Sequence, residues 1–122
     1  MTESIDFGIL TTAQSPARSF KAGEVVFREG EPAHELFVIK SGKVEIRTGN
    51  RLLDTLDDHS IFGEMALIDA SPRSATAVAA TDVTLVPISE KQFLFMVRQT
   101  PFFALNVMRT LAQRLRQMNQ TI

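Results

Sequence analysis

The chain has 122 residues, of which 44% are hydrophobic and 22% charged, with a formal net charge of −1 and no cysteine. This length supports one domain with a modest core, and the absence of cysteine excludes disulfides, cysteine-ligated metals and a thiol nucleophile. No apolar run is long enough to cross a membrane, and the acidic N-terminus MTESIDFGIL lacks the basic region of a secretory signal. We expect a cytoplasmic domain without membrane contact.

The charges are distributed unevenly along the chain. Residues 1–90 hold all fourteen acidic residues and eight basic ones, a balance of −6, whereas residues 91–122 hold five basic residues and no acid. Cations are favourable near a helix C-terminus and on a solvated face. The alternative is that the C-terminal segment faces an acidic barrel or an anionic ligand, and the two interpretations are compatible.

The first seventeen residues show little pattern beyond a short helical stretch near residues 5–10 and a Ser15-Pro16 turn. From Phe20 to Ile88 the pattern is that of strands, because short β-rich runs alternate with glycines or polar turns. Many short strands at close spacing predict an antiparallel β-barrel or jelly roll. The predicted strands cover residues 25–27, 36–39, 44–46 and 52–53, followed by two between Thr76 and Ile88 that break near Thr81-Asp82.

The periodicity changes at Ser89, which is a good N-cap for a helix over residues 89–99. Pro101 suits the first turn of a second helix, in which apolar residues recur at spacings of 4, 3, 4 and 3 and so define a seam. The predicted fold is α+β, with an N-terminal segment over residues 1–17, a barrel over about 18–88 and two helices over about 89–120. The seam residues are Ala104, Met108, Leu111, Leu115 and Met118.

Residues 62–78, which read FGEMALIDASPRSATAV, have the features of a receptor for a small sugar-phosphate. Gly63 lets the backbone approach a ligand closely, and residues 64–68 fit one helical turn whose first N–H groups favour an anion. Arg73 follows Pro72 and presents a planar, permanently charged group suited to a phosphate. The carboxylate of Glu64 would repel a phosphate, so its natural partner is a sugar hydroxyl.

This segment resembles the phosphate-binding cassette of the cyclic nucleotide-binding domain family. Residues 20–31 and 35–44 are similar to the early strands and glycine turns of that family, and the apolar helix around residues 105–118 lies where the family has its closing helix. The resemblance covers roughly residues 18–119. It implies an antiparallel β-roll with a short cassette helix, followed by two C-terminal helices.

The resemblance also implies a function and a site. The expected function is reversible binding of a cyclic nucleotide, with cAMP favoured over cGMP because Ser74 follows Arg73 as in the family's cAMP-binding bacterial activators. Arg73, Ser74 and backbone N–H groups would hold the phosphate, Glu64 and Gly63 the ribose 2′-hydroxyl, and Arg114 would lie near the phosphate. The implied ligand-binding residues are Gly63, Glu64, Met65, Ala66, Arg73, Ser74, Ala75 and Arg114.

The expected output of such a sensor is a movement of the C-terminal helix or a change in association. That helix can pair two copies as a homodimer, or a separate effector protein can read the change. Direct DNA binding is not expected, because the sequence stops at Ile122, where the family's activators continue into a helix-turn-helix domain. The Met1 start favours a complete small protein over an excised domain.

Two other classes of function stay open. One is a degenerate module that keeps the fold for dimerisation or partner docking without ligand, against which Glu64 and Arg73 argue. The other is a cupin-like metal enzyme, which is opposed by the lack of paired histidines: His34 and His59 are single histidines in polar surroundings. We interpret Asp57-Asp58 as part of a turn and not as a catalytic pair. We therefore expect no catalytic residues, no metal and no cofactor besides the nucleotide ligand.

Overall fold

The computed structural model describes residues 5–11 and 15–119. They form two compact units, one of residues 6–90 and a C-terminal unit of helices that begins at Lys91. Parts of the predicted N-terminal segment (residues 1–4 and 12–14) and the last residues of the predicted helical region (120–122) lie outside the described residues.

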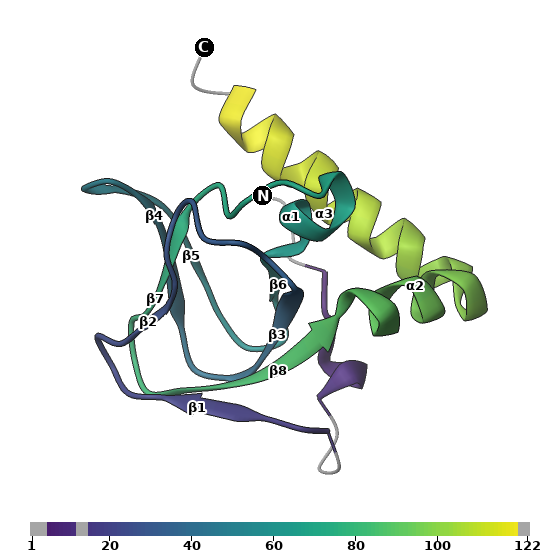
Figure 1. The fold of residues 1–122 in the computed structure, drawn as a ribbon, viewed down its shortest axis with the longest axis horizontal. Helices are drawn as coiled ribbons and strands as arrows, with labels where there is room; N and C mark the ends of the chain where they lie inside the picture. Colours follow the sequence, from purple (N-terminus) through teal and green to yellow (C-terminus); the bar gives the residue numbers. More distant parts are fainter. Residues whose placement is uncertain (1–4, 12–14, 120–122) are drawn as a thin grey trace. The chain divides into compact units, whose positions relative to one another are not determined.

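Residues 6–90 form two four-stranded antiparallel sheets that curve into a roll (Figure 1). The first sheet has the order β1 (Arg18–Phe20), β8 (Val83–Ser89), β3 (Glu35–Ser41) and β6 (Ile61–Phe62). The second has the order β2 (Val25–Phe27), β7 (Thr76–Ala79), β4 (Val44–Thr48) and β5 (Arg51–Leu56). The predicted fold class, an antiparallel β-roll with a cassette helix and C-terminal helices, is confirmed.

The centre of the first sheet is β3, which pairs with β8 on one side and β6 on the other. Its residues Leu36–Ile39 are all buried, although side chains alternate between the two faces of a strand. Phe37 and Ile39 point into the core between the sheets, and the short helices η1 (Gly8–Leu10) and α1 (Glu64–Asp69) pack on β3. Burial on both faces explains why this strand is a continuous apolar run.

The core between the sheets is built from small and medium apolar side chains of both sheets together with two phenylalanines. Phe20, Val26, Phe27 and Ile46 pack against it while remaining partly exposed. The buried core residues are Phe37, Ile39, Val44, Leu56, Phe62, Ala77, Ala79, Val83 and Leu85.

The N-terminal part of the roll contains a contact that the sequence did not predict. The N–H of buried Phe7 donates to the carbonyl of His59, and the His59 ring lies 3.3 Å from the Asp6 carboxylate. His59 also adopts φ +69°. The predicted polar, solvated surroundings of His59 are present, since its side chain is 40% exposed. Its pairing with Asp6, which lies 53 residues earlier in the chain, was not predicted from the sequence.

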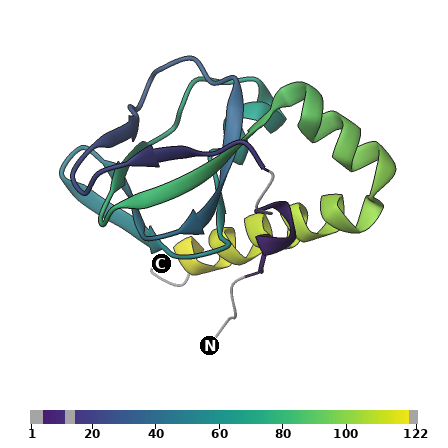
Figure 2. The ribbon, with the colours of Figure 1, turned by 90° about the horizontal axis from the view of Figure 1, so that it is seen from below.

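The C-terminal unit contains α2 (Glu90–Gln99) and α3 (Pro101–Asn119), joined by a sharp turn (Figure 2). Phe93 and Phe103 meet edge to face with their ring centroids 5.8 Å apart, which holds the two helices together. Among the described residues, no helix has both the length and the apolar character that a membrane span requires.

The predicted seam of α3 is only partly buried. Ala104 and Leu111 are partly buried, whereas Met108, Leu115 and Met118 are 59%, 58% and 68% exposed. Among the residues of α3 whose burial the structure describes, the buried positions are Phe103, Val107 and Thr110, each one residue before a position of the seam. The seam residues thus leave an exposed apolar stripe.

Candidate functional site

The predicted cassette begins at Gly63, between β6 and α1. Gly63 is the N-cap of α1 and has φ +79° and ψ 8°, a left-handed conformation that glycine adopts without steric cost. The single helical turn predicted after it is present as α1. The helix ends at Ala70, which is also left-handed with φ 57° and ψ 32°. Two left-handed residues therefore bracket α1 and set its direction.

Arg73 is the central side chain of the site. Its backbone is held by the loop after β2, because Arg73 N–H donates to Glu31 O at 2.9 Å and Arg73 O accepts from Gly30 N–H at 2.8 Å. The side chain is only 6% exposed. Its Nη1 donates to Gly63 O at 2.9 Å and its Nη2 to Glu35 O at 2.6 Å. The guanidinium thus bridges two carbonyls that lie just beyond the last pair of the β3–β6 ladder, Phe37 and Phe62.

One polar atom of this buried arginine is not satisfied: Nε has no hydrogen-bond partner. The guanidinium also lies over the ring of Phe27, with the Cζ atom 4.0 Å from the ring centroid. An unpaired buried N–H costs about 1–3 kcal/mol, and more when the group is charged. The site therefore contains a buried cation with unused capacity to donate a hydrogen bond.

The electrostatics of Arg73 follow from its burial. Burial lowers the pKa of Arg73 from its ordinary value, because the charged form loses hydration. The negative charges of Glu35, Glu31 and Glu64 oppose this change in pKa. Arginine stays charged in any case, so the surroundings hold a cation that is partly desolvated and attracts an anion.

The other predicted cassette residues surround Arg73 in different ways. Glu64, the first residue of α1, is buried at 2% exposure, and Ala66 and Ala75 are also buried. Met65 and Ser74 are exposed. The structure brings Gly63 and Arg73 into direct hydrogen-bond contact. Arg114 lies in α3, within the C-terminal unit.

Three residues of the site were not predicted from the sequence. Phe27 lies under the guanidinium, Glu35 supplies a carbonyl to it and Glu31 binds the Arg73 backbone. All three come from β2, the following loop and the start of β3, far from Arg73 in the chain. The sequence offered one signal, since residues 20–31 resemble the family's early strands, but nothing in their spacing placed them beneath the cassette.

The carboxylate of Glu35 is occupied by a second arginine. Arg18 of β1 binds it through both terminal nitrogens, at 2.5 and 3.0 Å. Such a bidentate arginine–carboxylate pair fixes the geometry of both side chains. Glu35 therefore accepts a hydrogen bond from Arg73 at its backbone carbonyl and is held by Arg18 at its side chain.

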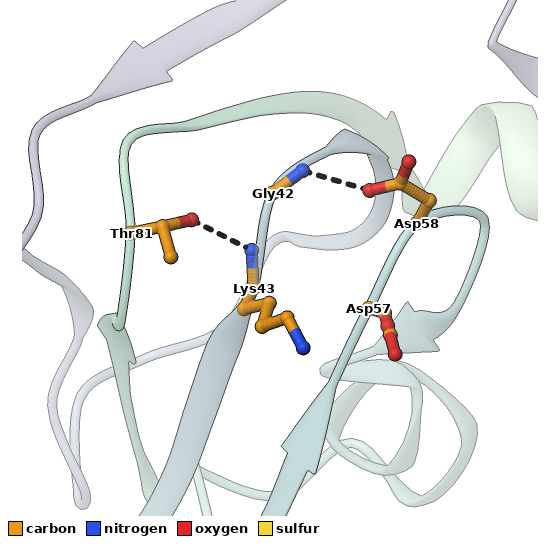
Figure 3. Close-up of a pocket in the computed structure, with 5 residues that line it drawn as sticks. All are labelled: Gly42, Lys43, Asp57, Asp58 and Thr81. Carbon is orange, nitrogen blue, oxygen red and sulfur yellow. Dashed lines mark hydrogen bonds between the residues drawn. The ribbon is translucent and has the colours of Figure 1, made fainter.

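A pocket of about 460 Å³ lies apart from the cassette residues. Figure 3 shows that it is lined by the turns that follow β3, β5 and β7. Its polar groups bind one another: Gly42 N–H donates to Asp58 Oδ1 at 2.8 Å and Lys43 N–H to Thr81 Oγ1 at 3.0 Å. These contacts tie three turns together, in agreement with the prediction that Asp57-Asp58 is a turn. In the part of the chain that the structure describes, no three acidic or histidine side chains gather as metal ligands would.

The model of the cyclic nucleotide-binding domain matches residues 17–100. The chain is 36% identical over 105 residues to the cyclic AMP receptor protein of Thermus thermophilus, covering 82% of this chain and 49% of that protein. The chain therefore spans about half the length of this curated relative.

Two solved structures have the same fold. The Thermus thermophilus catabolite activator protein superposes with a TM-score of 0.80 and 34% identity, covering 88% of this chain and 53% of that one. The cAMP-bound form of the EAL enzyme Bd1971 superposes with a TM-score of 0.66 and 33% identity, covering 87% of this chain and 29% of that one. The cGMP-bound form of the same enzyme matches with a TM-score of 0.67.

Proposed function

Because the chain belongs to the cyclic nucleotide-binding domain family, we propose that residues 62–78 are its phosphate-binding cassette and that cAMP is preferred over cGMP. The domain binds cyclic nucleotide as a regulatory module and is not itself the catalytic part of a protein. The observation that supports the proposed site most directly is Arg73, a 94% buried cation whose Nε lacks a hydrogen-bond partner.

In this proposal Arg73 binds the cyclic phosphate. A phosphate oxygen accepts from the guanidinium in a charge-assisted hydrogen bond, which is shorter and stronger than a neutral one. The phosphate thereby supplies a negative charge for the Arg73 guanidinium, which burial has partly deprived of water. Ser74 adds an exposed hydroxyl beside it, and backbone N–H groups at the turn before α1 complete the contacts.

The ribose is assigned to Glu64 and Gly63. Glu64 is the first residue of α1 and is buried next to the cassette turn, where its carboxylate can accept from the 2′-hydroxyl. Met65, Ala66 and Ala75 form the walls of the cassette around the sugar-phosphate. A carboxylate at this place also excludes a ligand with a second negative charge near the ribose.

The preference between the two nucleotides rests on Ser74. Serine follows the cassette arginine in the cAMP-binding activators that this chain resembles, and the relative from Thermus thermophilus is named a cyclic AMP receptor protein. The related domain of Bd1971 has been solved with either cAMP or cGMP bound. We therefore assign cAMP as the preferred ligand and cGMP as a weaker one.

The proposed output is a movement of α3. In the liganded state the base and phosphate offer contacts to the C-terminal helix, with Arg114 close to the phosphate. A ligand shifts a conformational equilibrium only through contacts that it makes in one state. The exposed stripe of Met108, Leu115 and Met118 gives the helix a surface for homodimerisation or for a separate effector protein. A module that retains only this docking role is the alternative function.

Isothermal titration of the purified chain with cAMP, cGMP and linear 5′-AMP tests the proposal. We expect saturable binding of both cyclic nucleotides, at least several-fold tighter for cAMP, and weak binding of 5′-AMP. Thermal unfolding provides a second measure, since a ligand at 100 times its dissociation constant stabilises the folded state by about 2.7 kcal/mol. Absence of binding by both cyclic nucleotides would leave the docking module as the function.

A further inference from the structure

We propose that Phe27 is the positioning residue of the site, whose ring holds the Arg73 guanidinium in place for the phosphate of the ligand. This inference rests on the proposed function. It assigns a role to an aromatic side chain outside the cassette, in a strand that carries none of the predicted ligand-binding residues.

The contact itself is close. The Cζ atom of Arg73 lies 4.0 Å from the centroid of the Phe27 ring, within the range at which a ring quadrupole attracts a cation. The next ring, that of Phe37, is 5.9 Å from the same atom. Because the guanidinium is buried, water competes with the ring less than it would at an exposed arginine.

The Phe27 ring is in turn fixed by two others. Its centroid lies 6.1 Å from that of Phe37 and 5.9 Å from that of Phe62, and the latter two rings are 5.5 Å apart. Phe37 and Phe62 belong to the buried core, whereas Phe27 lies partly exposed against it. The three rings make a rigid platform with the guanidinium on its outermost member.

The backbone of β2 directs Phe27 to this place. In the pairing of β2 with β7, Val25 pairs with Val78 and Phe27 with Ala77, so that β2 has one extra residue. Such a bulge re-aims the side chains that follow it. As a result Val26 and Phe27 both pack against the core, although neighbours in a regular strand point to opposite faces.

The expected contribution is preorganisation. A free arginine side chain has many rotamers, and immobilising one on binding costs about 0.5–1.5 kcal/mol, or about a 2- to 13-fold change in affinity. The Phe27 ring and the carbonyls of Gly63 and Glu35 already immobilise the Arg73 side chain in the protein without ligand. This entropic cost is therefore not incurred when the ligand binds. Removing the ring should therefore weaken cyclic nucleotide binding without removing any atom that touches the ligand.

The decisive variant changes the electronics of the ring and keeps its shape. With 3,4,5-trifluorophenylalanine at position 27 the ring quadrupole is weakened, so we expect affinity for cAMP to fall about 2- to 5-fold with an unchanged melting temperature. Phe27→Leu should lose about 2- to 13-fold and Phe27→Tyr should retain parental affinity. The matched control is Phe20→Leu, since Phe20 packs partly exposed on the same core and the arginine–ring contacts of the described residues do not involve it.

The Arg73→Gln background separates a positioning role from a structural one, because it removes the cation that the ring attracts. If Phe27 acts through the guanidinium, Phe27→Leu should have almost no further effect on affinity once Arg73 is glutamine. Equal losses in both backgrounds, or parental affinity for the fluorinated ring, would overturn the inference.

A measurement without ligand keeps this test independent of the proposed function. In the parent, the Nε–H proton of Arg73 should show a ring-current shift and slow exchange in NMR spectra, because the group is buried against Phe27. Phe27→Leu should abolish the shift, and an unchanged resonance would refute the positioning role. If the parent shows this signal but binds neither cAMP nor cGMP, the proposed function is disproved, whereas the contact between Phe27 and Arg73 is not.

Discussion

A side chain at position 63 would collide with Arg73. A Cβ atom built on Gly63 lies 2.7 Å from Nη1 of Arg73, a distance that real Cβ atoms essentially never show, and the carbonyl of the same glycine accepts a hydrogen bond from that nitrogen at 2.9 Å. Two of the ligand-binding residues predicted from the sequence, Gly63 and Arg73, therefore form one unit. The glycine is needed for its conformation and for the space that the guanidinium occupies.

Gly63→Ala should accordingly weaken binding more than it weakens the fold. The left-handed conformation costs a residue with a Cβ about 1–2 kcal/mol, and the guanidinium must also shift. We expect a loss of affinity for cAMP of at least about tenfold, measured by titration calorimetry, in a protein that remains folded. Gly23→Ala is the matched control, because Gly23 has φ +90° but nothing within 4 Å of its added Cβ; similar losses of affinity in both variants would show that strain alone is responsible.

Arg73→Ala should be the most damaging single substitution for binding. It leaves a largely desolvated phosphate without its counter-charge, which costs about 2–5 kcal/mol, or about 30- to several thousand-fold in affinity. The fold should survive with reduced stability, because the carbonyls of Gly63 and Glu35 lose a donor. Calorimetric titration beside Arg51→Ala, which removes an exposed arginine of the same unit, checks this; parental affinity of Arg73→Ala would place the phosphate elsewhere.

Glu64 should discriminate by the chemistry of the sugar. If its carboxylate accepts from the 2′-hydroxyl, Glu64→Gln weakens cAMP binding by about tenfold, the scale of one charge-assisted hydrogen bond. The same substitution should change the affinity for 2′-deoxy-cAMP much less. The comparison of four dissociation constants by titration decides it, and equal losses for both ligands would mean that Glu64 only shapes the turn.

The contribution of the Asp6–His59 contact to the stability of the fold should depend on pH. The hydrogen bond from Gly8 N–H, and then the hydrogen bond and charge of His59, lower the pKa of Asp6 from its ordinary value of 3.8. A lowered folded-state pKa means that the contribution to stability is complete above the unfolded value and is lost as pH falls through the folded value. Urea midpoints measured between pH 6 and 2 should fall less steeply for Asp6→Asn than for the parent, and high salt should reduce the difference, since both groups are exposed.

The C-terminal helix should respond to the ligand. Hydrogen exchange of backbone amides in residues 105–119 should slow when cAMP is added, because the proposed contacts to the base and to Arg114 form only in the liganded state. A chain shortened by residues 112–122 should keep the roll folded and bind cAMP more weakly. Unchanged exchange in these residues at saturating cAMP would exclude the proposed helix movement.

The cassette could be predicted from sequence because its determinants are local. Gly63, Glu64 and Arg73 lie within one short segment, and the helix between them follows from that segment alone. Most strands were also predictable, since their apolar runs are separated by glycines. The two-residue strand β6 was not, because two residues show no periodicity.

The parts of the site that escaped prediction depend on long-range geometry. Phe27 reaches Arg73 because a bulge in β2 turns it inward, and this bulge was not predicted from the sequence of β2. The inward hydrogen bonds of Arg73 to Gly63 O and Glu35 O require the β3–β6 pairing to be known. The pairing of His59 with Asp6 escaped prediction for the same reason, since only the fold brings the two residues together.

The left-handed end of α1 has a consequence for protein engineering. Ala70 occupies a backbone conformation at which glycine is the usual residue of a helix C-terminus, so the chain stores strain inside its proposed binding segment, residues 62–78. Ala70 is exposed and is not among the residues assigned to the ligand. Position 70 is therefore a place where a biosensor built from this domain can be tuned for rigidity while the groups that recognise the nucleotide stay untouched.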